Sequence, residues 1–432
     1  MDYLEALNLL CQPIRAGEYP RSLRHMRALL AELGNPHIGL PAVVVTGSTG
    51  KGTTCHHIAR LLRGNGLNVG LYTSPHLHSF RERFIFNENT ISETDFIAGV
   101  EAVQAAAARL EHTYSTFEQA TALAFWWFAR QKPDMIVLEI GLGGRFDAVN
   151  VAENVLAVFT RIEREHTAML GGTLGGVAWH KAGIIRPGGH AVTVKQSPDV
   201  FMMLQREAHA KNAQLHLDGG CNRTYEGGEA VLALAAWQHL LAQGFIPRRH
   251  FLPGLNFNSL PGRMERVQLN DHTLLIDGGH TPDAARRLRS EIARLAGVFK
   301  PVRLIIGMMG DKAAREYLRP FDAPRYQVVL TQAPGHRASA PATLYAEADY
   351  RYASVEIAAS LDDALAQVYT APEELIVVAG SLRMAAAARE SYGLLPAAEI
   401  AEAQATRQIF DGMAYLSRLR PTAQTGSAPL AG

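Results

Sequence analysis

Short apolar runs alternate along the chain with longer stretches in which apolar residues recur every three or four positions. The short runs predict buried strands, and the longer stretches predict helices with one apolar face, including helical, polar structure within residues 1–40. Such alternation is typical of a mostly parallel sheet with helices on both faces, which is the α/β class. The predicted strands are 41–46, 68–73, 135–140, 155–162, 191–194, 273–276, 303–306, 327–330 and 375–378, and the predicted helices include 51–63, 117–130, 175–184 and 230–241.

The pattern is interrupted in two places. Residues 213–228 are glycine-rich and irregular, and residues 253–262 combine turn formers with little periodicity, which favours a linker. We therefore expect a P-loop-type domain with a mostly parallel sheet over 1–252, a linker over 253–262, and a smaller Rossmann-like α/β domain over 263–416. The tail, 417–432, is rich in small and polar residues and is expected to be disordered.

Composition narrows the function classes. The chain has 432 residues with 42 Lys+Arg against 41 Asp+Glu, so no net charge draws it to nucleic acid or to a membrane. Its three cysteines are too few for a disulfide framework or a cysteine-rich zinc site. The N-terminal residues lack the features of a signal peptide, and the apolar run 120–129 is about half the length that spans a bilayer. We expect a cytoplasmic protein, acting as a monomer on small molecules.

The first candidate site is the glycine-rich turn between the strand at 41–46 and the helix at 51–63. Glycines let backbone N–H groups face a phosphate, and a helix N-terminus favours negative charge. A lysine here reaches the β- and γ-phosphates, and a threonine two residues later approaches Mg²⁺. Val45 stands where the strict P-loop has its first glycine, so a plain strand–turn–helix junction is the alternative. The candidate nucleotide-binding residues are Gly47, Ser48, Thr49, Gly50, Lys51, Gly52 and Thr53.

Charged residues also follow two other predicted strands. Glu139 ends the strand at 135–140, where a buried carboxylate is costly unless it has a partner, and this position favours a Mg²⁺ ligand near the phosphates. An ion pair with Arg145 is the alternative. His166 and Lys181 lie beyond strand ends on the same side. Each would be unremarkable alone, and they become candidates because of that shared position.

In the second half of the chain, Arg263 precedes the strand at 273–276, and Asp277 and His280 follow it. Their place at a strand's carboxyl end suggests a second half of a nucleotide site, supplied from beyond the linker. The alternative for Asp277 is a capping role at the following helix.

Taken together, these motifs resemble the folylpolyglutamate synthase and dihydrofolate synthase family of the Mur ligase superfamily. The resemblance runs from about Leu33 to about Arg389. Its most specific part is the stretch from Leu138 to Asn150, which is close to the family signature. Further matches are Gly47-Ser-Thr-Gly-Lys-Gly-Thr-Thr, Thr73-Ser-Pro-His-Leu, Phe80-Arg-Glu-Arg-Phe, Glu165-His-Thr, His180-Lys-Ala-Gly-Ile, Pro261-Gly-Arg, Asp277-Gly-Gly-His, Gly307-Met-Met-Gly-Asp-Lys and Ala379-Gly-Ser.

The resemblance implies an ATP-dependent ligase with two Mg²⁺ ions that joins an amino acid, expected to be L-glutamate, to a folate or pteroate carboxylate. It implies catalytic roles for Lys51, Glu139, His166 and a Lys181 that carries CO₂ as a carbamate. Metal ligands are implied at Thr53, Ser74, Glu139, His166 and Lys181, and ATP contacts at Glu229, Arg263, Asp277 and His280 besides the loop. Substrate contacts are implied at Arg81, Thr116, Phe117, Glu118, Phe146, Asp147 and Ala148, with Phe117 and Phe146 as core residues in the alternative interpretation.

Five positions depart from the family pattern. Thr49 and Thr281 each replace Asn, Glu165 replaces Asp, His180 replaces Glu, and Glu229 stands where an adenine-contacting Asn is expected. These changes touch adenine and substrate contacts more than phosphate chemistry. Two alternatives therefore stay open: a Mur-type ligase for a non-folate acid, and a nucleotide-binding protein that descends from such a ligase and has lost turnover.

Overall fold

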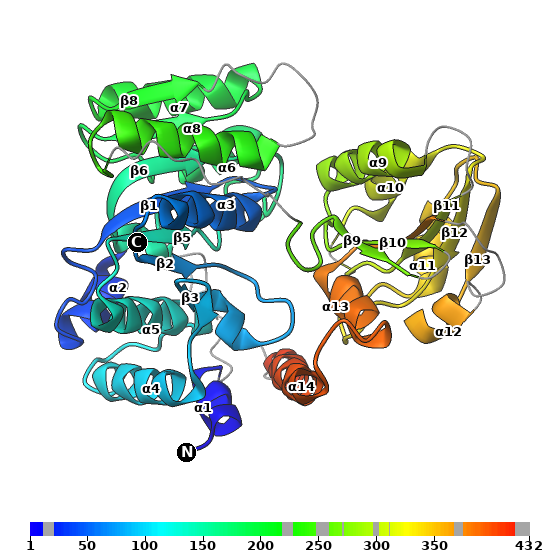
Figure 1. The fold of residues 1–432 in the computed structure, drawn as a ribbon, viewed down its shortest axis with the longest axis horizontal. Coiled ribbons are helices and arrows are strands. Elements are labelled where there is room, and N and C mark those ends of the chain that lie inside the picture. The colour runs from blue at the N-terminus through cyan, green and yellow to red at the C-terminus, as the bar shows by residue number, and fades with distance from the viewer. Residues whose placement is uncertain are drawn as a thin grey trace, which may run out of the picture.

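The computed structural model describes residues 1–11, 21–217, 228–247, 259–269, 272–296, 302–310, 312–366 and 375–419, with no side-chain description at 296, 398 and 412–419. Cys221, residues 253–258 of the predicted linker and residues 420–432 of the predicted tail lie outside this part of the chain. The described residues form two α/β units, each built around its own sheet (Figure 1). Within them, no helix has the length and apolar character needed to cross a membrane.

The larger unit is built on an eight-stranded sheet in the order β4-β3-β2-β5-β1-β6-β7-β8. Its strands pair in parallel from β2 through β8, while β3 and β4 form an antiparallel edge beside β2. The strands are β1 (Pro41–Thr46), β2 (Val69–Tyr72), β3 (Phe84–Phe86), β4 (Asn89–Thr90), β5 (Met135–Glu139), β6 (Glu153–Phe159), β7 (His190–Thr193) and β8 (Gln214–Leu217).

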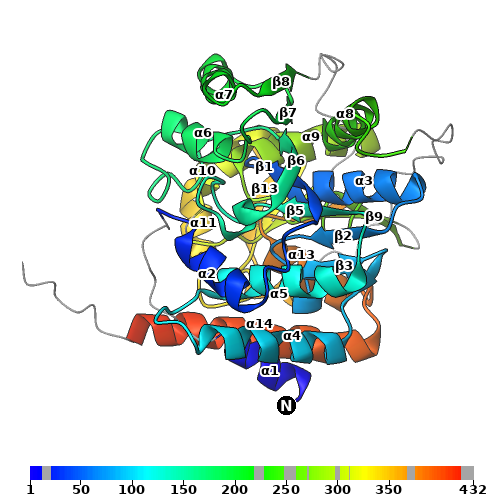
Figure 2. The same cartoon turned by 90° about the vertical axis from the view of Figure 1, so that its left-hand side faces the viewer.

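Helices cover both faces of this sheet because alternate strand residues point to opposite sides. Val43 and Val45 of β1 pack with the helices α3 and α8, while Val44 belongs to the cluster on the other face. In Figure 2, α2, α4 and α5 lie side by side on that other face. The helices are α1 (Tyr3–Leu10), α2 (Arg24–Glu32), α3 (Lys51–Gly64), α4 (Glu93–Ala107), α5 (Thr116–Gln131), α6 (Leu174–Ala182), α7 (Pro198–Ala210) and α8 (Gly228–Ala242), with short 3-10 turns at Phe80–Arg83 and Ala148–Val151.

The smaller unit has a six-stranded sheet in the order β13-β12-β11-β14-β10-β9, parallel except for the antiparallel edge strand β9. Helices α9 to α11 pack on one face, and α12 and α13 on the other. The elements are β9 (Glu265–Gln268), β10 (Thr273–Asp277), α9 (Pro282–Ala296), β11 (Val302–Ile306), α10 (Ala314–Leu318), a 3-10 turn at Arg319–Phe321, β12 (Tyr326–Leu330), α11 (Pro341–Glu347), β13 (Ser354–Ile357), α12 (Leu361–Ala366), β14 (Leu375–Ala379) and α13 (Leu382–Ser391).

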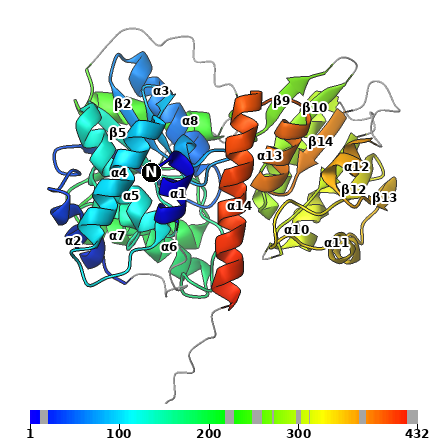
Figure 3. The ribbon, with the colours of Figure 1, turned by 90° about the horizontal axis from the view of Figure 1, so that it is seen from below.

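A long final helix, α14 (Ala397–Leu419), runs between the two units (Figure 3). Its Phe410 ring stacks on Phe80 of the larger unit at 5.8 Å between centroids. On the other side, Arg407 forms an ion pair with Glu390 of α13. The C-terminal helix therefore contacts both units and holds them together.

The α/β class and the predicted strands are confirmed, and the two sheets fall on either side of the predicted linker. Two expectations are corrected. Residues 214–217, expected to be irregular, form the edge strand β8, which needs only one partner strand and little apolar sequence. The helix α14 continues to Leu419, so residues 417–419 of the predicted tail are helical. The exact domain limits stay a prediction.

Candidate active site

The glycine-rich turn joins β1 to α3, as the sequence predicts. Gly50 has a left-handed backbone (φ +84°) and precedes the first residue of α3 without a side-chain cap. A side chain would be strained by this backbone conformation, and a Cβ here would also lie 2.3 Å from Oε1 of Glu229, so the position favours glycine. Since the first backbone N–H groups of a helix have no partner within it, the start of α3 is suited to bind an anion.

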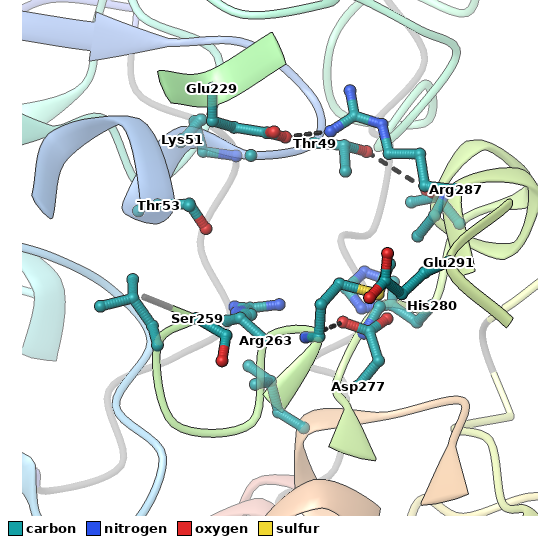
Figure 4. Close-up of a pocket in the computed structure, with 18 of the residues that line it drawn as sticks. Thr49, Lys51, Thr53, Glu229, Ser259, Arg263, Asp277, His280, Arg287 and Glu291 are labelled. Carbon is teal, nitrogen blue, oxygen red and sulfur yellow. Dashed lines mark hydrogen bonds and ion pairs between the residues drawn. The ribbon is translucent and has the colours of Figure 1, made fainter. Parts of the chain in front are cut away.

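The turn opens into a cavity of about 650 Å³ between the two units (Figure 4). This volume lies within the range of about 300–1,000 Å³ that is usual for ligand pockets. The larger unit lines the cavity with Ser48 to Thr53, Ser74, Glu139 and Glu229, and the smaller unit with Arg263, Asp277, His280 and Arg287. The structure thus gathers in one cavity nearly all the predicted nucleotide-binding residues, from segments more than 200 positions apart in the sequence.

Glu139 ends β5 beside β1 and is 4% exposed. Its Oε2 accepts a hydrogen bond from the Ser74 N–H at 2.9 Å, and burial raises the pKa of the carboxyl group. The alternative partner, Arg145, instead forms an ion pair with Glu207 at 2.7 Å. A buried carboxylate that faces the cavity beside the hydroxyl-bearing residues Thr53 and Ser74 is a set of oxygen ligands that fits Mg²⁺.

Lys181 lies under the turn and is 2% exposed. Its Nζ donates to the Gly47 carbonyl at 2.7 Å and to Oε1 of Glu165 at 3.0 Å. Burial lowers the pKa of Lys181 to about 8. Burial alone would raise the pKa of Glu165, but Lys181 and Lys51 outweigh it and lower that pKa to about 2. His166, next in the chain, has a left-handed backbone (φ 48°) and does not line the cavity.

In this form Lys181 does not fit a metal ligand, because an ammonium has no lone pair to donate. The Lys181–Glu165 ion pair already compensates the buried charge. The residues as they stand therefore match one Mg²⁺ site, at Thr53, Ser74 and Glu139, and not the second.

Asp277 ends β10 and is 4% exposed. Its two oxygens accept hydrogen bonds from the N–H groups of Met264 and Gly279, at 3.1 and 2.9 Å, and burial raises its pKa. The helix that follows is instead capped by Thr281, whose hydroxyl accepts from the Ala284 N–H at 3.2 Å. Asp277 therefore shapes the loop that carries Arg263 and is not a helix cap.

Two contacts cross the cavity between the units. Thr49 and Thr281, two of the positions that depart from the family pattern, approach within 3.2 Å through their hydroxyls. Glu229, a third such position, forms an ion pair with Arg287 of α9 (Figure 4). Asp283, one turn earlier on α9, also pairs with that arginine at 3.1 Å. Sequence reasoning missed Arg287 because an arginine on an amphipathic helix usually faces solvent.

A second cavity, of about 360 Å³, adjoins the first and shares Ser74 and Pro75 with it. Burial raises the pKa of its Asp147 to about 7, while the N–H groups of Leu142 and Val149 donate to that carboxylate at 2.8 and 3.0 Å. The lining contains the predicted substrate residues Phe117, Glu118, Phe146, Asp147 and Ala148, together with Leu23, Met26, Arg83 and Ser115, which were not predicted.

Two predicted substrate residues do not line this cavity. Arg81 forms an ion pair with Glu402 of α14 at 2.8 Å, and Thr116 is the first residue of α5, one position before the lining residue Phe117. Arg83, from the same Phe80-Arg-Glu-Arg-Phe segment, does line the cavity.

Comparison with known proteins identifies relatives across most of the chain. Residues 262–382 match the model of the Mur ligase, glutamate ligase domain. Folylpolyglutamate synthase from Lacticaseibacillus casei is 30% identical over 85% of this chain and 94% of that protein. Dihydrofolate synthase/folylpolyglutamate synthase from Bacillus subtilis is 31% identical over 75% of this chain and 86% of that protein. The structure of Mycobacterium tuberculosis folylpolyglutamate synthase complexed with ADP superposes with a TM-score of 0.79, at 27% identity, over 91% of this chain and all of that one.

An enzyme that activates an acid with ATP needs a nucleotide cavity that opens into an acid-binding cavity, and a second domain that excludes water from both. The fold and the two adjoining cavities meet this description, and the class they define is the ATP-dependent ligases. The sequence similarity extends over nearly the whole length of the relatives, so it identifies one family within this class. The chain belongs to the folylpolyglutamate synthase/dihydrofolate synthase family.

Proposed function

We propose that this chain joins L-glutamate to the carboxylate of a pteroate or folate and converts ATP to ADP and phosphate. The observation that carries the proposal is the meeting of the two cavities at Ser74 and Pro75. A flat heterocycle in the smaller cavity can direct its carboxylate toward the end of the nucleotide loop. The ligase class and the names of the relatives support glutamate and a folate as the two substrates.

The reaction has two steps. A carboxylate oxygen of the acid attacks the γ-phosphorus of ATP, the bond to the β–γ bridging oxygen breaks, and an acyl phosphate and ADP form. The amine of glutamate then attacks the acyl carbon, phosphate leaves with the former carboxylate oxygen, and the amine loses a proton. Phosphoryl transfer depends mainly on positioning and charge neutralisation. Lys51 and the N–H groups at the start of α3 hold the phosphates, and Arg263 and His280 approach them from the smaller unit.

Mg²⁺, held by Thr53, Ser74 and Glu139, supplies charge neutralisation at the transferring phosphate when bound. Coordination to Mg²⁺ would then offset the free-energy cost of burying the Glu139 carboxylate. His166 and a carbamylated Lys181 complete our proposal for a second Mg²⁺. That carbamate would lie beside Glu165, and two adjacent buried anions require a cation between them. Carbamylation and the second metal therefore depend on each other.

The smaller cavity accounts for recognition of the pterin. Phe117 and Phe146 offer aromatic surfaces to a flat ring, and Asp147 offers carboxylate oxygens to its ring N–H and amino groups. Arg83 brings a positive charge to the lining and can attract the negative end of the acid. Arg81, held by Glu402, and Thr116 act on the substrate only by supporting neighbouring segments.

Glu229 would contact the nucleotide differently from an adenine-contacting Asn, because a carboxylate only accepts hydrogen bonds whereas an amide also donates them. It is 19% exposed in its side chain and is neutralised by Arg287, so it is an acceptor at the edge of the cavity. We propose that the ion pair fixes the start of α8 against α9 and positions that carboxylate for the adenine amino group.

The test is glutamate-dependent release of phosphate from ATP, with dihydropteroate, tetrahydrofolate and unrelated carboxylic acids supplied in parallel. Release with either pterin, and only when glutamate is present, supports the proposal. Release with an unrelated acid alone would keep the ligase chemistry and reject the folate substrate. Tight ATP binding without release for any acid would identify a nucleotide-binding protein without turnover.

A further inference from the structure

Three histidines meet at the outer edge of the larger sheet, and none of them lines either cavity. His190 begins β7, His216 lies on β8, and His239 lies on α8 (Figure 1 shows β8 and α8 side by side). In the parallel register, Gln214 pairs with His190 and His216 pairs with Val192. The two strand histidines therefore point to the same face of the sheet, the face that α8 covers.

Their ring nitrogens converge. One ligand atom from each histidine lies within 4.8 Å of the other two. The ring centroids are 4.8 Å apart for His190 and His239, and 4.6 Å apart for His216 and His239. Nδ1 of His190 and Nε2 of both other rings are buried and have no hydrogen-bond partner among the described residues. Buried ring nitrogens normally have partners, so three together point to a ligand that all three share.

We propose that His190, His216 and His239 form a binding site for a divalent transition-metal ion, with Zn²⁺ as the representative. Imidazole nitrogens bind Zn²⁺ at about 2.0–2.1 Å, and three histidines leave one tetrahedral position open for water or another ligand. The three ligand nitrogens lie within 4.8 Å of one another. Small side-chain rotations would place each of them about 2.0–2.1 Å from one central ion. Mg²⁺ prefers oxygen ligands, so this site is chemically distinct from the magnesium site at Glu139.

The surroundings favour the neutral rings that bind a metal. Burial lowers the pKa of His190, and burial together with the two neighbouring rings lowers the pKa of His239 to about 4. Burial therefore favours the uncharged form of both rings, which keeps a lone pair for a metal ion. The Phe245 ring lies edge-on to the His190 ring, at 6.3 Å between centroids.

The position of the site suggests what the ion does. It connects the edge strand β8 to α8, the helix whose first turn carries Glu229 into the nucleotide cavity. A bound ion would stabilise this edge of the larger unit and keep α8 in place. It acts as a structural brace and takes no part in the reaction.

The experiment uses the full chain without an affinity tag, freed of metal by a chelator and dialysed. Zn²⁺ binding is measured by calorimetry, and Co²⁺ is added as a spectroscopic substitute in a separate titration. We expect one equivalent of Zn²⁺ to bind in the presence of excess Mg²⁺, a visible spectrum typical of four-coordinate Co²⁺, and a higher thermal midpoint with Zn²⁺. His216→Ala and His239→Ala should each weaken this binding by about 10-fold or more.

The matched control is His209→Ala, which removes an exposed histidine on α7. This variant should still bind one equivalent of Zn²⁺ with the affinity of the wild type. His216→Gln and His239→Gln keep side-chain size and replace the alanine variants if these unfold. Absence of a stoichiometric Zn²⁺ equivalent in the wild type would overturn the proposal. So would binding that folded variants at His216 and His239 leave unchanged. Because the readout is metal binding, either result is independent of ligase activity.

Discussion

The ion pair between Lys181 and Glu165 offers a quantitative test of the site's electrostatics. The two side chains are 2% and 15% exposed, and Nζ and Oε1 are 3.0 Å apart. Glu165→Gln leaves the ammonium buried without its anion, and breaking a buried pair in this way costs about 3–5 kcal/mol. The fall in the pKa of Glu165 from 4.5 to about 2 corresponds to about 3 kcal/mol by itself. We therefore expect Glu165→Gln to lower the free energy of unfolding by about 3 kcal/mol.

The assay is urea unfolding followed by tryptophan fluorescence. All 4 tryptophans, Trp126, Trp127, Trp179 and Trp237, lie in the larger unit, so the signal reports the unit that contains the ion pair. A double-mutant cycle with Lys181→Met isolates the pair, because the double variant removes both charges. The control is Glu32→Gln, which removes a 36% exposed partner of Arg109 and should cost at most about 1 kcal/mol.

The pH dependence of the free energy of unfolding shows which residue of the pair stabilises the fold and which opposes it. Since the folded pKa of Glu165 is depressed, its contribution is present above pH 4.5 and is lost as pH falls toward 2. Lys181 also has a depressed pKa, so its burial opposes folding below pH 8, and this cost declines as pH rises from about 8 to 10.5. In Glu165→Gln, the loss of stability that Glu165 causes as pH falls from 4.5 toward 2 should be absent. Wild-type stability in Glu165→Gln at pH 7, or equal destabilisation in the single and double variants, would refute this reasoning.

Three further predictions concern turnover, and a fourth concerns the carbamate on Lys181. Lys51→Ala should reduce kcat by about 10³-fold, because we propose that this lysine neutralises phosphate charge. Circular dichroism should stay unchanged, because the side chain is only half-buried, and near-normal kcat would exclude Lys51 from the site. Glu139→Ala should raise the Mg²⁺ concentration needed for half-maximal rate, and an unchanged Mg²⁺ titration would contradict its role as ligand. Because burial raises the pKa of Asp147 to about 7, the KM for the pterin substrate should fall as its carboxylate ionises between pH 6 and 8, and Asp147→Asn should flatten this profile. Lys181 should give a carbamate signal in ¹³C NMR with ¹³C-bicarbonate and Mg²⁺, absent in Lys181→Ala; no signal in the wild type would reject carbamylation.

Local sequence was sufficient to predict structure where all the determining residues lie within one short segment. The turn from Gly47 to Gly50 combines a buried strand, glycines and a helix start within a dozen residues, so the strand–turn–helix junction could be predicted. The position of Glu139 at the cavity could be predicted for a similar reason, since a carboxylate at the end of an apolar strand needs a partner. Its role as a metal ligand stays a prediction. The partners of Lys181 were less accessible, because the ion pair with Glu165 requires knowledge of how α6 packs under the turn.

What the sequence did not reveal depends on contacts between distant segments. His190, His216 and His239 have no metal-binding spacing and meet only through strand register and the packing of α8. Arg287 looks like a solvent-facing helix residue until α9 lies opposite Glu229. The strand β8 was missed because an edge strand of four residues carries too little periodicity to separate it from a loop.

We expect the enzyme to phosphorylate the acid before glutamate attacks. The most direct measurement supplies the enzyme with ATP, Mg²⁺, L-glutamate and a pteroate or folate labelled with ¹⁸O in its reacting carboxylate. Mass spectrometry should detect a glutamyl conjugate of the pterin and released phosphate that has gained one ¹⁸O atom. A conjugate accompanied by unlabelled phosphate would contradict the acyl phosphate, and the absence of any glutamyl conjugate would contradict the assigned reaction.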